Sequence, residues 1–127
     1  MAVDKSTPIL VVDDYKTMIW IVRNLLQQLG FENVDDAGDG ASALAKLREK
    51  SYGLVISDWM MEPMSGIDLL RQVRADPSLK ALPFIMITAE NRKDRVALAE
   101  QAGADAYIVK PFNAEVLSDR IAAVMGR

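Results

Sequence analysis

Cysteine and histidine are both absent from this chain of 127 residues. Without cysteine the chain can form no disulfide, no thiolate nucleophile and no thiolate metal site. Without histidine it has no imidazole to act as a base or as a metal ligand. Any metal ion bound by these side chains must therefore be held by oxygen atoms.

Long apolar runs and one-sided charge are lacking as well. Runs such as Pro8–Val12 and Phe84–Ile87 are far shorter than the roughly 20 residues that cross a bilayer. No basic stretch leads into an apolar segment with a cleavage site at the N-terminus, so we expect a cytoplasmic protein without a membrane partner. The 15 basic and 18 acidic residues form no basic stripe, which argues against binding to nucleic acid.

The composition is that of one compact domain. Half of the residues are apolar, which is enough to form a single hydrophobic core and excludes a disordered chain. We find no internal repeat, low-complexity tract or linker. We therefore expect a single domain over residues 1–127 with no output domain attached.

Short apolar runs alternate with amphipathic stretches along the whole chain. The expected strands are Ile9–Val12, Leu54–Ile56, Phe84–Ile87 and Tyr107–Val109, with a weaker candidate at Asn33–Asp36. The expected helices are the stretch from Met18 to Leu29, which ends at Gly30, then Ala41–Lys50, Ile67–Arg74, Lys93–Ala102 and Ala114–Met125, the last capped by Asn113. This order predicts an α/β fold, a doubly wound (βα)5 three-layer sandwich around a five-stranded parallel sheet.

Polar side chains stand where four of these strands end. The positions are Asp13-Asp14, Ser57-Asp58, Thr88 and Lys110-Pro111. Taken singly, an aspartate there could be a helix cap and the lysine a solvated surface charge. Ligands of open α/β sheets bind at this edge, and the joint occurrence at four strand ends favours a functional site.

Three carboxylates at one edge need a neutralising partner. Two unit charges about 4 Å apart repel by roughly 4 kcal/mol at an effective dielectric of 20, and Lys110 cannot neutralise all three aspartates. Either one carboxyl group keeps its proton or a cation binds, and Mg²⁺ suits an all-oxygen site, with Mn²⁺ as a substitute. Such a site could accept a phosphoryl group, with Asp58 as nucleophile, Thr88 as hydrogen-bond donor and the Asp13-Asp14 pair holding the ion.

Several segments carry a family resemblance. They read LVVDDYKTM, IVRNLLQQLGF, YGLVISDW, ITAE and AGADAYIVKPF. Over nearly its whole length the chain resembles the receiver domains of two-component response regulators, in particular the single-domain, CheY-like chemotaxis regulators. The resemblance implies a flavodoxin-like topology with strand order 2-1-3-4-5.

The same resemblance implies roles for individual residues. Asp58 would be the phosphoacceptor, and Thr88 and Tyr107 would be switch residues beside Lys110, whose bond to Pro111 would be cis. The implied Mg²⁺ ligands are Asp13, Asp14, Asp58 and the backbone carbonyl of Met60.

Partners follow from the resemblance too. The phosphoryl donor would be a histidine kinase or a histidine phosphotransfer protein, which is compatible with the absence of histidine here. The expected output is altered binding of a downstream target protein at the surface of the fourth helix, fifth strand and fifth helix, and the flagellar motor switch is one candidate. We expect a monomeric signalling protein, not an enzyme, although it would assist its own phosphorylation and dephosphorylation.

Two departures from the family pattern keep alternatives open. The family often reads Met-Pro-x-Met-Asp-Gly where this chain has Met61-Glu62-Pro63-Met64-Ser65-Gly66, and Met60 stands where chemotaxis regulators carry asparagine. The shifted Pro63 leaves open a scaffold that keeps the pocket but acts only by binding proteins. An aspartyl-phosphate phosphatase would need an acid–base carboxylate at Met60, and a flavin mononucleotide carrier would need a glycine-rich phosphate loop at Asp13–Lys16.

Three further features have no assigned chemistry. Helical spacing places Trp20 opposite the apolar side of its helix, where it is either a lone exposed aromatic or a docking anchor for the phosphoryl donor. Arg92, Lys93 and Arg95 form either a solvated face or a recognition surface. Glu90 could order a water molecule or pair with a basic residue.

Overall fold

The computed structural model describes residues 4–62, 64–89 and 93–125. Strands and helices alternate along the chain as expected. The elements are β1 (Ile9–Val12), α1 (Lys16–Gln28), β2 (Val34–Ala37), α2 (Gly40–Glu49), β3 (Leu54–Asp58), α3 (Gly66–Ala75), β4 (Phe84–Thr88), α4 (Lys93–Ala102), β5 (Ala106–Val109) and α5 (Ala114–Met125). The largest boundary differences are two residues, since β3 continues to Asp58 and α1 begins at Lys16, while β2 lies one residue later than expected.

The five strands form one parallel sheet with the order β2-β1-β3-β4-β5. This is the predicted flavodoxin-like arrangement. The chain winds from β1 outward to β2, then returns past β1 to β3 and continues to β5. The winding direction therefore reverses between β1 and β3, and the carboxyl ends of these two strands border the crevice where ligands of such folds bind.

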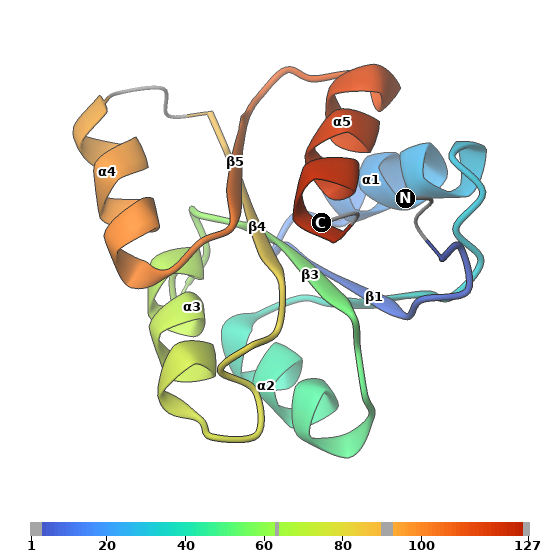
Figure 1. Ribbon diagram of the computed structural model, residues 1–127. Coiled ribbons are helices and arrows are strands. Elements are labelled where there is room, and N and C mark those ends of the chain that lie inside the picture. Colours follow the sequence, from blue (N-terminus) through green and yellow to red (C-terminus); the bar gives the residue numbers. More distant parts are fainter. Residues whose placement is uncertain (1–3, 63, 90–92, 126–127) are drawn as a thin grey trace.

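Helices α1 and α5 lie on one side of the sheet and α2, α3 and α4 on the other (Figure 1). Alternation of side chains along the strands divides the core between these two faces. In β1, Ile9 and Val11 pack with α1 and α5, whereas Leu10 and Val12 pack with α2 and α3. Both faces are covered, so the strands are apolar without alternation, as in other parallel sheets. Within the described ranges, no helix has the length and hydrophobicity needed to span a membrane.

Short polar contacts determine where helices begin and end. The Asn113 side chain accepts a hydrogen bond from the Val116 N–H at 2.9 Å and so caps α5 as predicted. Gly30 has a φ of 96°, which confirms the left-handed residue expected after α1. The Asp39 side chain accepts from the Ser42 N–H at 2.7 Å and caps α2. Local capping thus marks the end of α1 and the starts of α2 and α5.

Charged side chains line the edge strand β2. Asp35 accepts hydrogen bonds from Lys50 Nζ at 3.0 Å and from the Tyr52 hydroxyl at 2.6 Å. Asp36 forms an ion pair with Arg23 of α1. Both carboxylates are only partly buried, so the edge of the sheet presents paired charges at the surface.

Arg74, at the end of α3, joins three separate segments. Its guanidinium donates two hydrogen bonds to the Gly103 carbonyl, at 3.0 and 2.7 Å, and one to the Leu82 carbonyl at 2.6 Å. It also pairs with Asp105 at 3.1 Å. Arg74 therefore connects α3 with the C-terminal end of α4 and with the segment just before β4.

Candidate functional site

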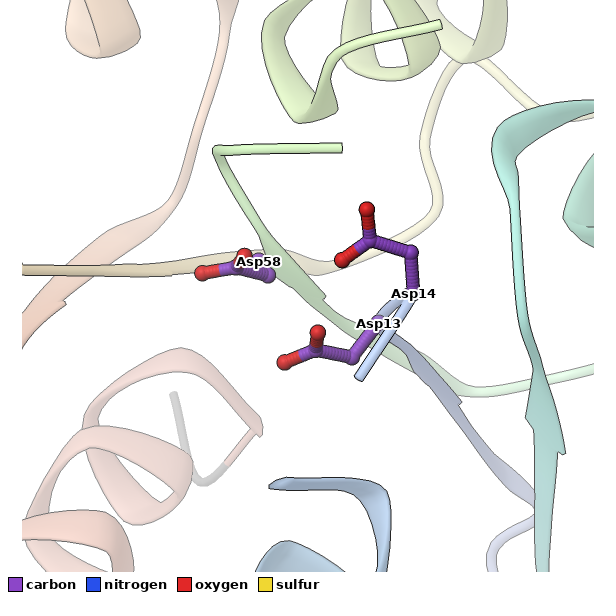
Figure 2. Close-up of side chains that lie close together, drawn as sticks. All are labelled: Asp13, Asp14 and Asp58. Atoms are coloured by element: carbon purple, nitrogen blue, oxygen red, sulfur yellow. The ribbon is translucent and has the colours of Figure 1, made fainter. Parts of the chain in front are cut away.

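Three aspartates meet at the carboxyl ends of β1 and β3 (Figure 2). Val12 is in register with Ser57, so Asp13, which follows β1, lies beside Asp58, the last residue of β3. Each of Asp13, Asp14 and Asp58 offers a carboxylate oxygen within 4.8 Å of the other two. The strand ends thus bring Asp58 beside the adjacent Asp13 and Asp14, from which it is far apart in the sequence.

Lys110 reaches this cluster from the end of β5. Its Nζ donates a hydrogen bond to Asp58 Oδ1 at 3.0 Å and lies 4.0 Å from Asp13 Oδ2. The Asp58 side chain is 8% exposed, so the contact is largely shielded from solvent. The peptide bond between Lys110 and Pro111 is cis, as expected.

Burial and like charge both act on Asp13. Loss of solvent at this buried position, together with the nearby Asp58 and Asp14 carboxylates, raises the pKa of Asp13 from 3.8 to about 6. The Tyr15 N–H donates to Asp13 Oδ1 at 2.9 Å, and this bond and Lys110 act in the opposite direction without cancelling the rise. The fully ionised cluster is therefore unfavourable without a further cation.

The donor set fits a hard divalent cation. Carboxylate oxygens are ligands that Mg²⁺ and Mn²⁺ accept, and three of them close together can share one ion that also keeps water molecules. Met60, expected to add its carbonyl, lines the same open pocket of about 360 Å³. Its side chain is 71% exposed and forms part of the rim with Tyr15.

The β4–β5 side of the site carries the expected switch residues. Thr88 is the last residue of β4 and is buried, and its carbonyl accepts a hydrogen bond from the Lys110 N–H at 2.8 Å. Tyr107 in β5 is half-buried and its ring meets the edge of Trp59 at a centroid distance of 6.2 Å and an angle of 72°. Sequence reasoning missed Trp59, although its place directly after Asp58 was a usable signal.

The backbone after β3 folds back against Asp58. The Gly66 N–H donates to the Trp59 carbonyl at 2.8 Å, and a Cβ at Gly66 would lie 2.1 Å from the Asp58 carbonyl oxygen. Glycine is therefore required for this close approach. Pro63 lies outside the described residues, as do Glu90 and Arg92 in the connection from β4 to α4.

Trp20 lies on a different surface. It is 65% exposed on α1, which confirms the exposure that helical spacing predicts. Together with Arg23, Asn24 and Gln27 it lines a shallow hollow beside β2 rather than the acidic pocket. The structure therefore groups the other expected site residues at one edge of the sheet and leaves Trp20 on the flank.

The chain belongs to the family described as the response regulator receiver domain, which it matches over residues 9–122. It is 49% identical to the chemotaxis protein CheY of Pseudomonas aeruginosa, covering 94% of this chain and 96% of that protein. It is 47% identical to chemotaxis protein CheY-3 of Vibrio cholerae, covering 98% and 95% of the two chains.

Solved structures agree with this placement. Chemotaxis protein CheY4 of Vibrio cholerae superposes with a TM-score of 0.87 at 34% identity, over 94% of this chain and 98% of that one. A response regulator receiver domain protein from Clostridium thermocellum superposes with a TM-score of 0.85 at 31% identity, over 95% of each chain. The chain is thus a phosphorylation-dependent signalling switch of the two-component type and not a classical enzyme.

Proposed function

We propose that Asp58 accepts the phosphoryl group. One of its carboxylate oxygens attacks phosphorus, the bond from phosphorus to the donor's imidazole nitrogen breaks, and the leaving imidazole takes up a proton. The observation that carries this proposal is the 3.0 Å contact between Lys110 Nζ and Asp58 Oδ1 within the acidic cluster. The ammonium group can remain beside the new phosphoryl oxygens and balance their charge.

The same geometry supports a site for Mg²⁺, with Mn²⁺ as a substitute. Asp13, Asp14 and Asp58 would bind the ion with the Met60 carbonyl, and a bound ion would neutralise charge on the transferring phosphoryl group. Thr88 would donate its hydroxyl to a phosphoryl oxygen, and Tyr107 would respond to that movement. In these roles the Thr88 hydroxyl and the Lys110 ammonium group would both contact the phosphoryl oxygens.

The donor would be a phosphohistidine on a histidine kinase or a histidine phosphotransfer protein. Trp20 would help to dock it, since α1 also contributes Thr17 and Met18 to the wall of the acidic pocket. The output would be altered binding of a target protein at α4, β5 and α5. Because relatives at 47% identity or more are named chemotaxis proteins, the flagellar motor switch is the first target to test.

A scaffold that keeps the pocket without being phosphorylated is the main alternative. The aspartyl-phosphate phosphatase has less support, because the position two residues beyond Asp58 carries the exposed thioether of Met60 and no acid or base.

Incubation with acetyl phosphate and Mg²⁺, followed by intact mass measurement and peptide mapping, tests the proposal. We expect one added phosphoryl group on Asp58 and none in the Asp58→Asn variant. An unmodified wild-type chain would favour the scaffold, and a modification at another residue would refute the assignment of Asp58.

A further inference from the structure

Trp59 contacts two elements that the proposed phosphotransfer chemistry does not use. Its ring is 4% exposed, meets Tyr107 of β5 edge-on, and lies beneath the Arg95 guanidinium of α4, with 5.6 Å from the guanidinium carbon to the ring centroid. The Trp59 N–H donates to the Ile87 carbonyl at 2.9 Å. The backbone of Trp59 is thus fixed directly beside Asp58.

Packing around the Arg95 contact is incomplete. A cavity of about 160 Å³ lies between Arg95, Trp59, Met60, Thr88 and Ala89. A cation over an aromatic face is a weak contact that is easily exchanged for another partner, unlike a closely packed apolar cluster. The first turn of α4 is therefore held to the site by a contact that can be released.

The other end of α4 is held differently. Gly103, directly after α4, accepts two hydrogen bonds from Arg74, and Asp105 pairs with the same guanidinium. Hydrogen bonds and an ion pair to Arg74 thus attach the C-terminal end of the helix, whereas Arg95 contacts the site through the face of Trp59.

We infer that Arg95 is a positioning residue that holds the first turn of α4 on Trp59 while Asp58 is unphosphorylated, and that phosphorylation releases it. The inference rests on the proposed function. The added phosphoryl charge attracts a guanidinium more strongly than a ring face does, and the cavity wall formed by Thr88 and Met60 lies beside the phosphoacceptor. The two states are α4 held on Trp59 and α4 released. Phosphorylation can shift the balance between them only if it interacts differently with each, and we assign that difference to Arg95.

Hydrogen exchange of the α4 amides at residues 96–102 tests the inference on the full chain. Exchange is measured before and after acetyl phosphate and Mg²⁺, and intact mass records phosphorylation in the same samples. In the wild type we expect phosphorylation to accelerate α4 exchange about threefold, the scale of one exposed cation–π contact. In Arg95→Ala we expect fast exchange of α4 both before and after phosphorylation. In Arg95→Lys we expect an acceleration on phosphorylation that is smaller than in the wild type and larger than in Arg95→Ala.

Arg71→Ala is the matched control. It removes an exposed guanidinium that pairs with Asp68 of its own helix at 3.7 Å, and its response should equal that of the wild type. The inference is overturned if Arg95→Ala still accelerates threefold on phosphorylation, or if Arg71→Ala reproduces the Arg95→Ala result. A wild-type chain that carries no phosphoryl group would instead overturn the proposed function and this inference with it.

Discussion

The carboxyl edge of the sheet consists of two halves with different physical character. The β1–β3 half holds three carboxylates, two of them buried, whereas the β4–β5 half holds the Thr88 hydroxyl and the Tyr107 ring, which Trp59 contacts from the end of β3. Lys110 belongs to the second half and reaches the first through Asp58. In the proposed function, metal binding and phosphotransfer take place in the charged β1–β3 half, and the conformational response takes place in the β4–β5 half.

Breaking the link between the halves should have the largest effect. We expect Thr88→Ala and Lys110→Ala to abolish the change in α4 exchange on phosphorylation, while the free energy of unfolding changes by about 1 kcal/mol or less, since strand-end side chains support little of the core. Hydrogen exchange and chemical denaturation measure the two quantities. Phosphorylated variants that respond like the wild type would show that the halves communicate by another route. The control is Ser51→Ala, which removes an exposed hydroxyl group just before β3.

Asp13→Asn should change the charged half alone. The raised pKa of Asp13 means that the folded state binds this proton more tightly than the unfolded state, so wild-type stability falls as pH rises from about 4 to about 6. Without Mg²⁺ we expect the variant to be more stable than the wild type above pH 6, by on the order of 2 kcal/mol, with the difference vanishing near pH 4.

Mg²⁺ should raise the melting temperature of the wild type and do so less in Asp13→Asn and Asp14→Asn, because each loses a ligand. Calorimetry at pH 4 and pH 8, with and without millimolar Mg²⁺, measures both effects. Equal Mg²⁺ responses in all three proteins would place the metal elsewhere.

Trp20→Ala should leave both halves unchanged. We expect near-normal labelling by acetyl phosphate and transfer from the phosphohistidine donor slowed by about tenfold, the scale of an interface hot spot, because only the second route needs docking. Gln27→Ala, on the same exposed face of α1, is the control. Equal effects on both routes, or no effect on transfer, would remove Trp20 from the docking surface.

Met60→Asn should have the smallest effect, at the boundary between the halves. An amide at this exposed rim position can hold the attacking water near the acyl phosphate, which the thioether cannot do. We therefore expect the phosphoryl half-life to shorten by about threefold. Loss of radiolabel over time measures it, and an unchanged half-life would contradict the prediction.

The charged half was more predictable from sequence than the aromatic half. Asp13, Asp14 and Asp58 each follow a strong strand signal, and the rule that parallel strands end at one edge brings them together. The Trp59 contacts depend on side-chain directions from α4 and β5, which have no local signature in the sequence. Ile21 shows the same limit within one helix, since this apolar residue of α1 is 37% exposed.

The charges along β2 have a consequence for colloidal behaviour. The outer strand of a sheet can template a foreign strand, and charged side chains oppose such edge-to-edge aggregation. The hydrogen bonds from the Tyr52 hydroxyl and Lys50 hold the pKa of Asp35 below its usual value, so this carboxylate keeps its negative charge to lower pH than an ordinary aspartate. Negative charge at the β2 edge therefore opposes its pairing with another copy of the chain in acidic solution as well as at neutral pH.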